Sequence, residues 1–169
     1  HDAVTELLNR DSFAFEMHSL IEVAAGREAG AALLIVDIDN FQDINDTYGP
    51  HKADHVLSQL SARLKALCGK SSIMGRLGSD EFGILLLDSD AAAAHRLVEA
   101  VERDLAATPL RIDEHGVHIT VTTGIVLYPE HGASTGELLA NLTLALVQAR
   151  RLTPGHGHVL TLDAEAIAD

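Results

Sequence analysis

The stretch GRLGSDEFGILL, residues 75–86, places two adjacent carboxylates, Asp80 and Glu81, between two short apolar runs. The glycine and serine before the acids favour a tight turn, and the runs on either side have the length of β-strands. The pattern therefore predicts a β-hairpin over residues 72–87 with both acids at its tip. Two carboxylates held side by side at a strand end are a candidate ligand set for a cation.

A second acidic strand end lies earlier in the chain. AALLIVDID, residues 31–39, is a continuous apolar run that closes on Asp37 and Asp39, the pattern of a strand buried on both faces. If the hairpin pairs beside this strand, three or four carboxylates converge at one edge of the sheet. Such a cluster favours Mg²⁺ together with a nucleoside triphosphate, because Mg²⁺ keeps substrate phosphates in its shell. An alternative stays open here, since strand-end acids often cap helices and turn acids are often solvated.

The rest of the chain alternates between helical and strand patterns. Apolar spacing predicts a turn and a helix over residues 2–25, and further helices over 40–48, 51–67, 91–107 and 135–152. β-Branched runs predict two strands over 111–127, turning around Glu114, His115 and Gly116, and an edge strand over 158–163. This order indicates an α+β fold in which helices cover a mostly antiparallel sheet of the ferredoxin-like βαββαβ kind.

The composition narrows the classes of function. The chain has 12 Lys and Arg against 25 Asp and Glu, a formal net charge of −13, which argues against a nucleic-acid partner. No apolar run reaches the ~18 to 20 residues of a membrane span, so we expect no membrane contact by this domain. Cys68 is the only cysteine, which favours a reducing, cytoplasmic compartment. We expect residues 1–169 to form one domain cut from a longer chain, because the sequence does not begin with Met.

Four stretches carry a resemblance to a known family. They are DIDNFQDINDTYGPHKADHVL (37–57), RLGSDEF (76–82), DAVTELLNRDSF (2–13) and VTTGIVLYPEHG (121–132). Together they resemble the GGDEF domain of diguanylate cyclases over nearly the whole chain. The resemblance implies the GGDEF fold, which is similar to that of nucleotide cyclases. It also implies that two GTP molecules are joined into cyclic di-GMP, with each of two facing domains of a homodimer supplying one GTP and Mg²⁺.

The resemblance implies roles for the acids. Asp37 and Glu81 fall where family members ligate Mg²⁺, with the carbonyl of Ile38 assisting. Asp80 falls at the acid that helps to activate the attacking 3′-hydroxyl. Asp80 and Glu81 are therefore the expected catalytic residues.

Other matches concern the nucleotide itself. Asn45 and Asp54 match the pair that hydrogen-bonds guanine, and an amide with a carboxylate can read the acceptor and donor edge of guanine together. The region around Phe41 resembles the helix start whose backbone N–H groups hold phosphates. Arg150 stands where a phosphate-binding lysine is usual, and Gln42 stands where a lysine is expected near the transferring phosphate.

Two departures from the family pattern affect the expected activity. Ser79 replaces the second glycine of the signature, at a cost of about 1–2 kcal/mol if that position needs a positive φ. Gln42 lacks the cation of the usual lysine. Losing one cation beside a developing phosphoryl charge costs about 2.7–4 kcal/mol, or roughly 100- to 1000-fold in rate.

A further departure concerns regulation. The family's feedback site ends in R-x-x-D shortly before the signature, where this chain has Gly69 and Ser72, so we expect that site to be absent. Three hypotheses remain: a diguanylate cyclase of reduced activity, a GTP-binding domain without turnover that regulates a fused domain such as an EAL phosphodiesterase, and a dimerisation module. A fused sensory domain is also expected.

Overall fold

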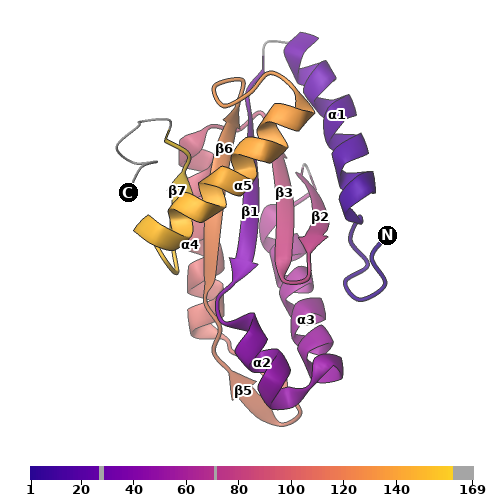
Figure 1. Cartoon of the computed structure of the whole chain (residues 1–169), viewed down its shortest axis with the longest axis vertical. Coiled ribbons are helices and arrows are strands. Elements are labelled where there is room, and N and C mark those ends of the chain that lie inside the picture. The colour runs from indigo at the N-terminus through magenta and orange to yellow at the C-terminus, as the bar shows by residue number, and fades with distance from the viewer. Residues whose placement is uncertain (27–28, 71, 162–169) are drawn as a thin grey trace.

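The computed structural model describes residues 1–26, 29–70 and 72–161, which form a central sheet flanked by helices (Figure 1). The helices are α1 (Arg10–Gly26), α2 (Phe41–Tyr48), α3 (Pro50–Cys68), α4 (Ala91–Ala107) and α5 (Thr135–Leu152). The strands are β1 (Ala31–Ile38), β2 (Ser72–Gly78), β3 (Glu81–Leu87), β4 (Leu110–Ile112), β5 (His115–Val117), β6 (Val121–Tyr128) and β7 (Gly157–Val159). None of the helices described is long and apolar enough to cross a membrane.

Five strands form one sheet in the order β2-β3-β1-β6-β7. Neighbouring strands run antiparallel, except that β6 and β7 run parallel. Strands β1, β2, β3 and β6, with helices α2, α3 and α4 between them, make a ferredoxin-like βαββαβ unit, so the predicted fold class is confirmed. Strand β7 lies at the sheet edge as predicted, whereas residues 162 and 163 of the predicted strand lie outside the described residues.

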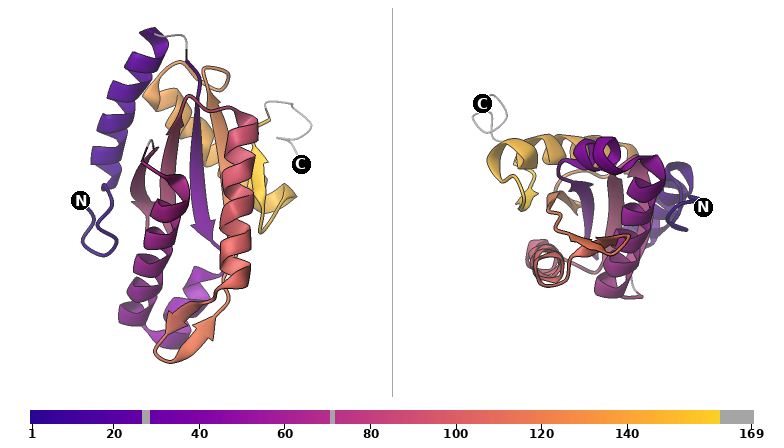
Figure 2. Two further views of the ribbon diagram at one scale, coloured as in Figure 1. Left: turned by 180° about the vertical axis from the view of Figure 1, so that it is seen from behind. Right: turned by 90° about the horizontal axis from the view of Figure 1, so that it is seen from below.

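Strand β1 is buried on both faces, as its continuous apolar run predicts. Its side chains alternate between two cores: Leu33 and Ile35 pack with α1 and α5, and Leu34 and Val36 pack with α3 and α4. Figure 2 shows the sheet between these two helical layers. The same alternation directs Asp37, two residues after Ile35, towards the side of α5.

The segment between α4 and α5 differs from the prediction of two strands around Glu114, His115 and Gly116. It contains three strands, of which β4 and β5 form a separate two-stranded ribbon and only β6 joins the central sheet. The ribbon is held by α3, because the Gln59 amide accepts from the Arg111 N–H (2.9 Å) and donates to the Arg111 carbonyl (2.6 Å). β-Branched residues mark strands but not the sheet that each strand joins, so the pattern could not reveal this arrangement.

The N-terminal segment lies along the edge of β2. Leu8 forms a parallel bridge with Gly75, and the Arg76 N–H donates to the Leu8 carbonyl at 2.8 Å. The Arg76 guanidinium also bonds both carboxylate oxygens of Asp2, each at 3.2 Å. These contacts cover an edge strand that would otherwise be open, and they support the hairpin that carries the two signature acids.

Candidate active site at the end of strand β1

The hairpin tip lies directly against the end of β1. Asp37 is the register partner of Glu81 on β3, and the Ile38 N–H donates to the backbone carbonyl of Asp80 at 3.2 Å. Directly opposed residues of an antiparallel pair project from the same face of the sheet. Three of the predicted site acids, Asp37, Asp80 and Glu81, are therefore neighbours.

Asp37 is buried, with 6% of its surface exposed, and its two oxygens differ. Oδ2 accepts hydrogen bonds from Arg150 Nη2 (2.6 Å) and Nε (3.1 Å). Oδ1 is buried and has no hydrogen-bond partner among the described residues. Burial raises the pKa of the Asp37 carboxyl to about 6; the Arg150 guanidinium opposes this rise and the negative charge of Asp80 adds to it. A buried carboxylate oxygen without a donor is costly unless a ligand satisfies it.

Asp39 does not join these acids. Its Oδ2 accepts from the Thr120 hydroxyl at 2.6 Å, and its Oδ1 accepts from the Thr122 hydroxyl at 2.7 Å. Thr122 in turn accepts from the Gly155 N–H at 2.9 Å. Asp39 therefore ties the end of β1 to β6 and to the segment after α5. The expectation of up to four converging carboxylates is reduced to three.

A cavity of about 640 Å³ opens beside Asp37. Its walls come from the end of β1, the start of β6, α5 and the segment after α5: Asp37, Ile38, Asp39, Asn40, Thr120, Thr122, Arg150, Pro154, Gly155 and His156. Within the described ranges, no three His, Cys, Asp or Glu side chains are already arranged to hold a metal ion. Asp37 instead faces the guanidinium of Arg150, a half-exposed side chain that has room to move.

The turn between β2 and β3 corrects the expectation for Ser79. Among the described residues other than glycine, a positive φ occurs only at Glu6, Asn40, Asp88 and Asp113. Ser79 is thus in ordinary backbone and is exposed, so serine introduces no left-handed strain there. Gly78 is the position next to Glu81, because a Cβ atom on it would meet Oε1 of the flexible Glu81 side chain. A side chain at position 78 would therefore displace the Glu81 carboxylate.

The start of α2 carries the predicted phosphate-binding residues. Phe41 is the first residue of the helix, and no side chain caps it, since Asn40 makes no side-chain cap hydrogen bond. Gln42 is exposed, and its Nε2 donates to Asp46 Oδ1 one turn later at 2.8 Å. The first turn of α2 therefore has neither a side-chain cap nor a cationic side chain.

The predicted guanine-binding residues lie on either side of a sharp corner. Asn45 is in α2 and Asp54 is in α3, and Gly49 with φ 89° joins the two helices. Within the described part of the chain, neither side chain makes a hydrogen bond. Asp54 lines a cavity of about 420 Å³ beside the Lys52–Asp113 ion pair, but Asn45 does not line it. Both side chains are therefore available to a ligand, but they do not line the same cavity.

Comparison with known proteins identifies the family. The family profile described as "Diguanylate cyclase, GGDEF domain" matches residues 1–154. The chain belongs to the GGDEF family. This confirms the resemblance inferred from residues 37–57 and 76–82, and it makes the chain a GGDEF domain of cyclic di-GMP signalling.

Several relatives of this GGDEF domain come from Pseudomonas aeruginosa. MucR, named a bifunctional diguanylate cyclase/cyclic di-GMP phosphodiesterase, is 33% identical over 150 residues, 89% of this chain and 22% of MucR. The diguanylate cyclase TpbB is 32% identical over 165 residues, 96% of this chain and 38% of TpbB. A solved structure of only the GGDEF domain of TpbB matches with a TM-score of 0.92 at 30% identity, covering 99% of this chain and 98% of that chain. The chain therefore spans well under half the length of both full-length relatives.

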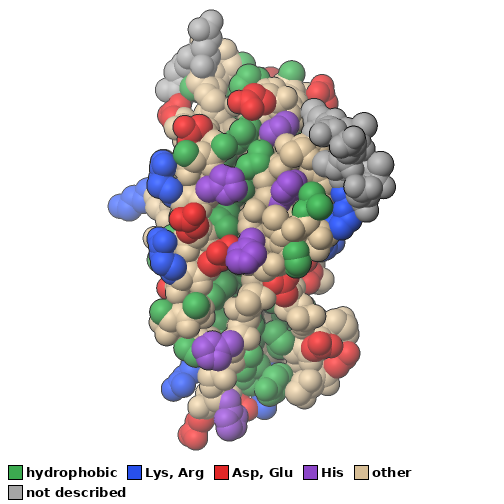
Figure 3. Space-filling model, turned by 90° about the vertical axis from the view of Figure 1, so that its left-hand side faces the viewer, with side chains coloured by type: hydrophobic (Ala, Val, Ile, Leu, Met, Phe, Trp, Pro, Cys, Tyr) green, Lys and Arg blue, Asp and Glu red, His purple; other side chains and the backbone are tan. Residues whose placement is uncertain are grey.

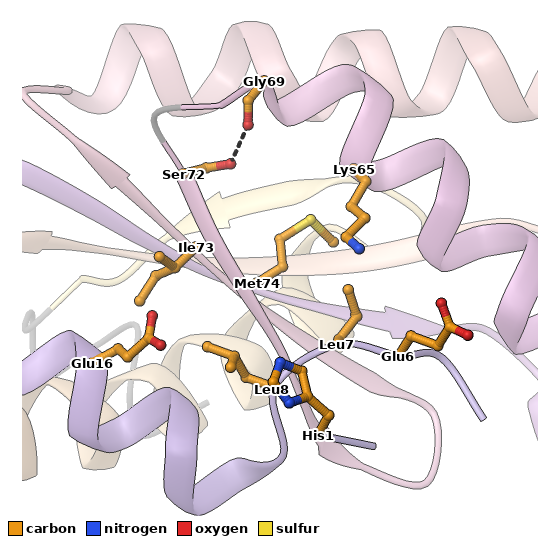
Figure 4. Close-up of a pocket in the computed structure, with 10 residues that line it drawn as sticks. All are labelled: His1, Glu6, Leu7, Leu8, Glu16, Lys65, Gly69, Ser72, Ile73 and Met74. Atoms are coloured by element: carbon orange, nitrogen blue, oxygen red, sulfur yellow. Dashed lines mark hydrogen bonds between the residues drawn. The ribbon is translucent and has the colours of Figure 1, made fainter. Parts of the chain in front are cut away.

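Gly69 and Ser72, at the positions of the family's feedback motif, line a cavity of about 260 Å³ between α3, β2 and the N-terminal segment (Figure 4). The Ser72 hydroxyl donates to the Gly69 carbonyl at 2.9 Å. The other ionisable residues of the lining are Lys65, Glu6, Glu16 and His1. Because the lining has two carboxylates and no arginine, it is poorly suited to the two phosphates of cyclic di-GMP.

Sequence reasoning missed the residues that build the wall of the Asp37 cavity opposite the hairpin. Thr120 and Thr122 hold Asp39, and Gly155 and His156 close the wall after α5. Thr122 is buried, with 1% of its surface exposed. The alternating threonines of ITVTTG were a usable signal, since residues two apart on a strand project from one face. Nothing in the sequence linked them to Asp39, because the link depends on sheet register.

Proposed function

We propose that this GGDEF domain binds GTP with Mg²⁺ at the end of β1 and condenses two GTP molecules to cyclic di-GMP with reduced activity. The observation that carries the proposal is the buried, unpartnered Oδ1 of Asp37 beside Asp80 and Glu81. A carboxylate in that state is stabilised by a hard cation. The raised pKa of Asp37 is consistent with a site whose negative charge is compensated by a bound cation.

The donor set fits Mg²⁺. The Asp37 and Glu81 carboxylates and the Ile38 carbonyl are oxygen ligands, and Mg²⁺ is usually bound by one or two carboxylates together with substrate phosphates. The phosphates of GTP would therefore complete the coordination of Mg²⁺ at this site. When bound, Mg²⁺ would neutralise phosphate charge and polarise the phosphoryl group under attack.

The chain's own residues would orient the nucleotide. Arg150 is half exposed, so its guanidinium can leave Asp37 for a phosphate, which suits its bidentate geometry. The backbone N–H groups at Phe41 would hold a second phosphate at the start of α2. Asp80, at the hairpin tip, would accept the proton of the attacking 3′-hydroxyl.

Base recognition is assigned to Asn45 and Asp54, whose side chains are free of hydrogen bonds to other described residues. A carboxylate accepts from the two N–H donors of guanine, and an amide donates to its O6 acceptor. Adenine presents the opposite pattern at this edge. GTP is therefore expected to bind more tightly than ATP.

The reduced activity rests on Gln42. Its amide is tied to Asp46 and carries no charge, so the first turn of α2 cannot stabilise a developing phosphoryl charge as a lysine would. The same observation favours a second candidate, a domain that binds GTP without turnover and controls a fused domain. The name of MucR, which couples cyclase and phosphodiesterase activities in one longer chain, is consistent with that arrangement.

The domain's setting follows from the family. Catalysis would need a second GGDEF domain facing the first, most simply in a homodimer, because each domain supplies one GTP. The chain covers 22% of MucR and 38% of TpbB, which supports a place within a longer protein with sensory or EAL domains. We propose a cytoplasmic location for the domain, where GTP and Mg²⁺ are available.

The test is incubation of the chain with GTP and Mg²⁺, followed by chromatographic resolution of the products and parallel calorimetry with GTP and ATP. Slow formation of cyclic di-GMP with preferential GTP binding would support the cyclase. GTP binding without product would support the regulatory candidate. Asp54→Ala should abolish the preference for GTP over ATP, with Asp43→Ala on the exposed surface of α2 as the control. Equal, weak binding of both nucleotides to the unmodified chain would contradict both candidates.

A further inference from the structure

A second cavity, of about 360 Å³, lies on the other side of the wall that closes the Asp37 cavity. It is formed by the C-terminal half of α4, the approach to β6 and the segment after α5. Its floor consists of Leu105, Ile119 and Val121, which are at most 8% exposed and belong to the core beneath α4. A mainly apolar hollow of this size is within the range of small-molecule sites.

The mouth of this cavity is acidic. Glu102 lines it, and its carboxylate is about one-third exposed. Among the described residues its partner is the imidazole of His156, whose Nδ1 lies 3.3 Å from Glu102 Oε1 and whose side chain is 70% exposed. Figure 3 shows this side of the molecule, where histidine side chains are scattered over the surface near α4 and β7 with hydrophobic groups between them. Because this exposed imidazole makes a single contact with Glu102, a cationic ligand could take its place beside the carboxylate.

We propose that this cavity binds a small amphipathic cation, with an aromatic or branched apolar body and a primary ammonium group. The body would fill the space over Leu105, Ile119 and Val121, and the ammonium would replace His156 as the partner of Glu102. Charge complementarity selects the cation, because a partly buried carboxylate attracts it and the domain as a whole carries a net charge of −13. The same negative charges would repel an anionic ligand.

The location couples this site to the end of β1. Thr120, Gly155 and His156 line both cavities, so the two share one wall. That wall holds Asp39 through the Thr120 hydroxyl and, from Gly155, through Thr122. A ligand that moves His156 therefore acts on the segment that positions the end of β1. The binding proposal itself does not depend on the proposed reaction with GTP.

The experiment uses three probes of one shape and different charge: 2-phenylethylamine, 2-phenylethanol and 3-phenylpropanoate. Each is titrated into the isotope-labelled chain, and the amide signals of Leu105, Ile119 and Val121 are followed by NMR. We expect saturable shifts with the amine and at least a tenfold weaker response to the carboxylate.

Two variants and a control complete the test. Glu102→Gln should lower the affinity for the amine to that for the alcohol, whereas Glu99→Gln, one turn earlier and paired with Arg103, should not. Ala106→Phe, at an exposed position of the lining, should block all three probes without disturbing the core. The proposal is overturned if no probe gives saturable shifts at these residues, if the carboxylate binds as well as the amine, or if Ala106→Phe leaves amine binding intact.

Discussion

Asp37 and Asp39 stand two residues apart at the end of one strand, yet their surroundings are opposite. Asp39 faces β6, where the Thr120 and Thr122 hydroxyls satisfy both of its oxygens. Asp37 has Glu81 as its register partner on β3, and one of its oxygens is buried without a donor. The cation beside Asp37 is a half-exposed arginine rather than a fixed donor.

The difference separates a structural acid from a binding acid. Each oxygen of Asp39 accepts a hydrogen bond from a threonine hydroxyl, so removal of this carboxylate should cost stability. A buried carboxylate with an oxygen that lacks a hydrogen-bond donor and with acidic neighbours costs stability when no cation is bound. Under the proposed function, the contrast assigns ligand binding to Asp37 and stability of the fold to Asp39.

The largest expected effect is on the rate of cyclic di-GMP formation, when a lysine replaces Gln42. Gln42→Lys should raise cyclic di-GMP formation at saturating GTP and Mg²⁺ by about 100- to 1000-fold, because a charge then faces the phosphoryl group. In that background Asp37→Asn should abolish turnover, while Asp39→Asn should keep most of it. The control is Asp46→Ala, which frees the Gln42 amide without adding a charge and should not raise the rate. An unchanged rate in Gln42→Lys would show that the charge is not the limiting loss.

The next effect concerns stability. Asp39→Ala removes two hydrogen bonds to a carboxylate and leaves the buried Thr122 with one partner fewer, so the free energy of unfolding should fall by about 2–3 kcal/mol. Asp37→Ala, measured without Mg²⁺, should change it by less than about 1 kcal/mol, since the lost ion pair offsets the removal of a buried charge. Urea unfolding of both variants measures the difference. The reverse order of the two costs would contradict the division of roles.

A third effect is expected in the pH dependence of stability. The pKa of Asp37 rises from 3.8 to about 6 on folding, so between these values the folded state keeps a proton that the unfolded state has lost. The contribution of Asp37 is therefore most favourable below pH 3.8 and declines as pH rises towards 6, by at most about 3 kcal/mol. Unfolding of the chain and of Asp37→Asn in a metal chelator should differ in slope across this window. Parallel profiles for the two proteins would refute the assigned pKa.

The smallest effect is expected at the turn. Ser79→Gly should change stability and GTP affinity by no more than about 0.5 kcal/mol, because Ser79 is exposed and not in a left-handed conformation. Gly78→Ala is the matched variant, and it should weaken Mg²⁺-dependent GTP binding because its methyl group takes the place of the Glu81 carboxylate. A strong gain of affinity in Ser79→Gly would mean that nucleotide binding alters the turn.

The features that could be predicted from the sequence are those that depend on the spacing of apolar and turn residues. The apolar run from Ala31 predicted a strand buried on both faces, and the alternation of turn residues with apolar runs predicted the hairpin. Together these two patterns predict from the sequence alone that Asp37 lies close to Asp80 and Glu81. These are consequences of side-chain periodicity, which a single sequence displays.

What could not be predicted depends on register and dihedral angle. The hydrogen bonds from Thr120 and Thr122 to Asp39 depend on the pairing of β1 with β6, which no local sequence pattern reveals. Ser79 causes no backbone strain because its φ is not positive, whereas the glycine usual in the family had suggested a positive φ at this position. The detached β4–β5 ribbon likewise depends on a long-range contact from Gln59.

The central claim is that Asp37, and not Asp39, supplies the metal ligand. Calorimetric titration of GTP into the chain, with Mg²⁺ and with chelator, tests it most directly when repeated on Asp37→Asn and Asp39→Asn. We predict that Mg²⁺ tightens GTP binding at least tenfold in the unmodified chain and in Asp39→Asn, and has no effect in Asp37→Asn. A full Mg²⁺ dependence in Asp37→Asn, or its loss in Asp39→Asn alone, would contradict the account.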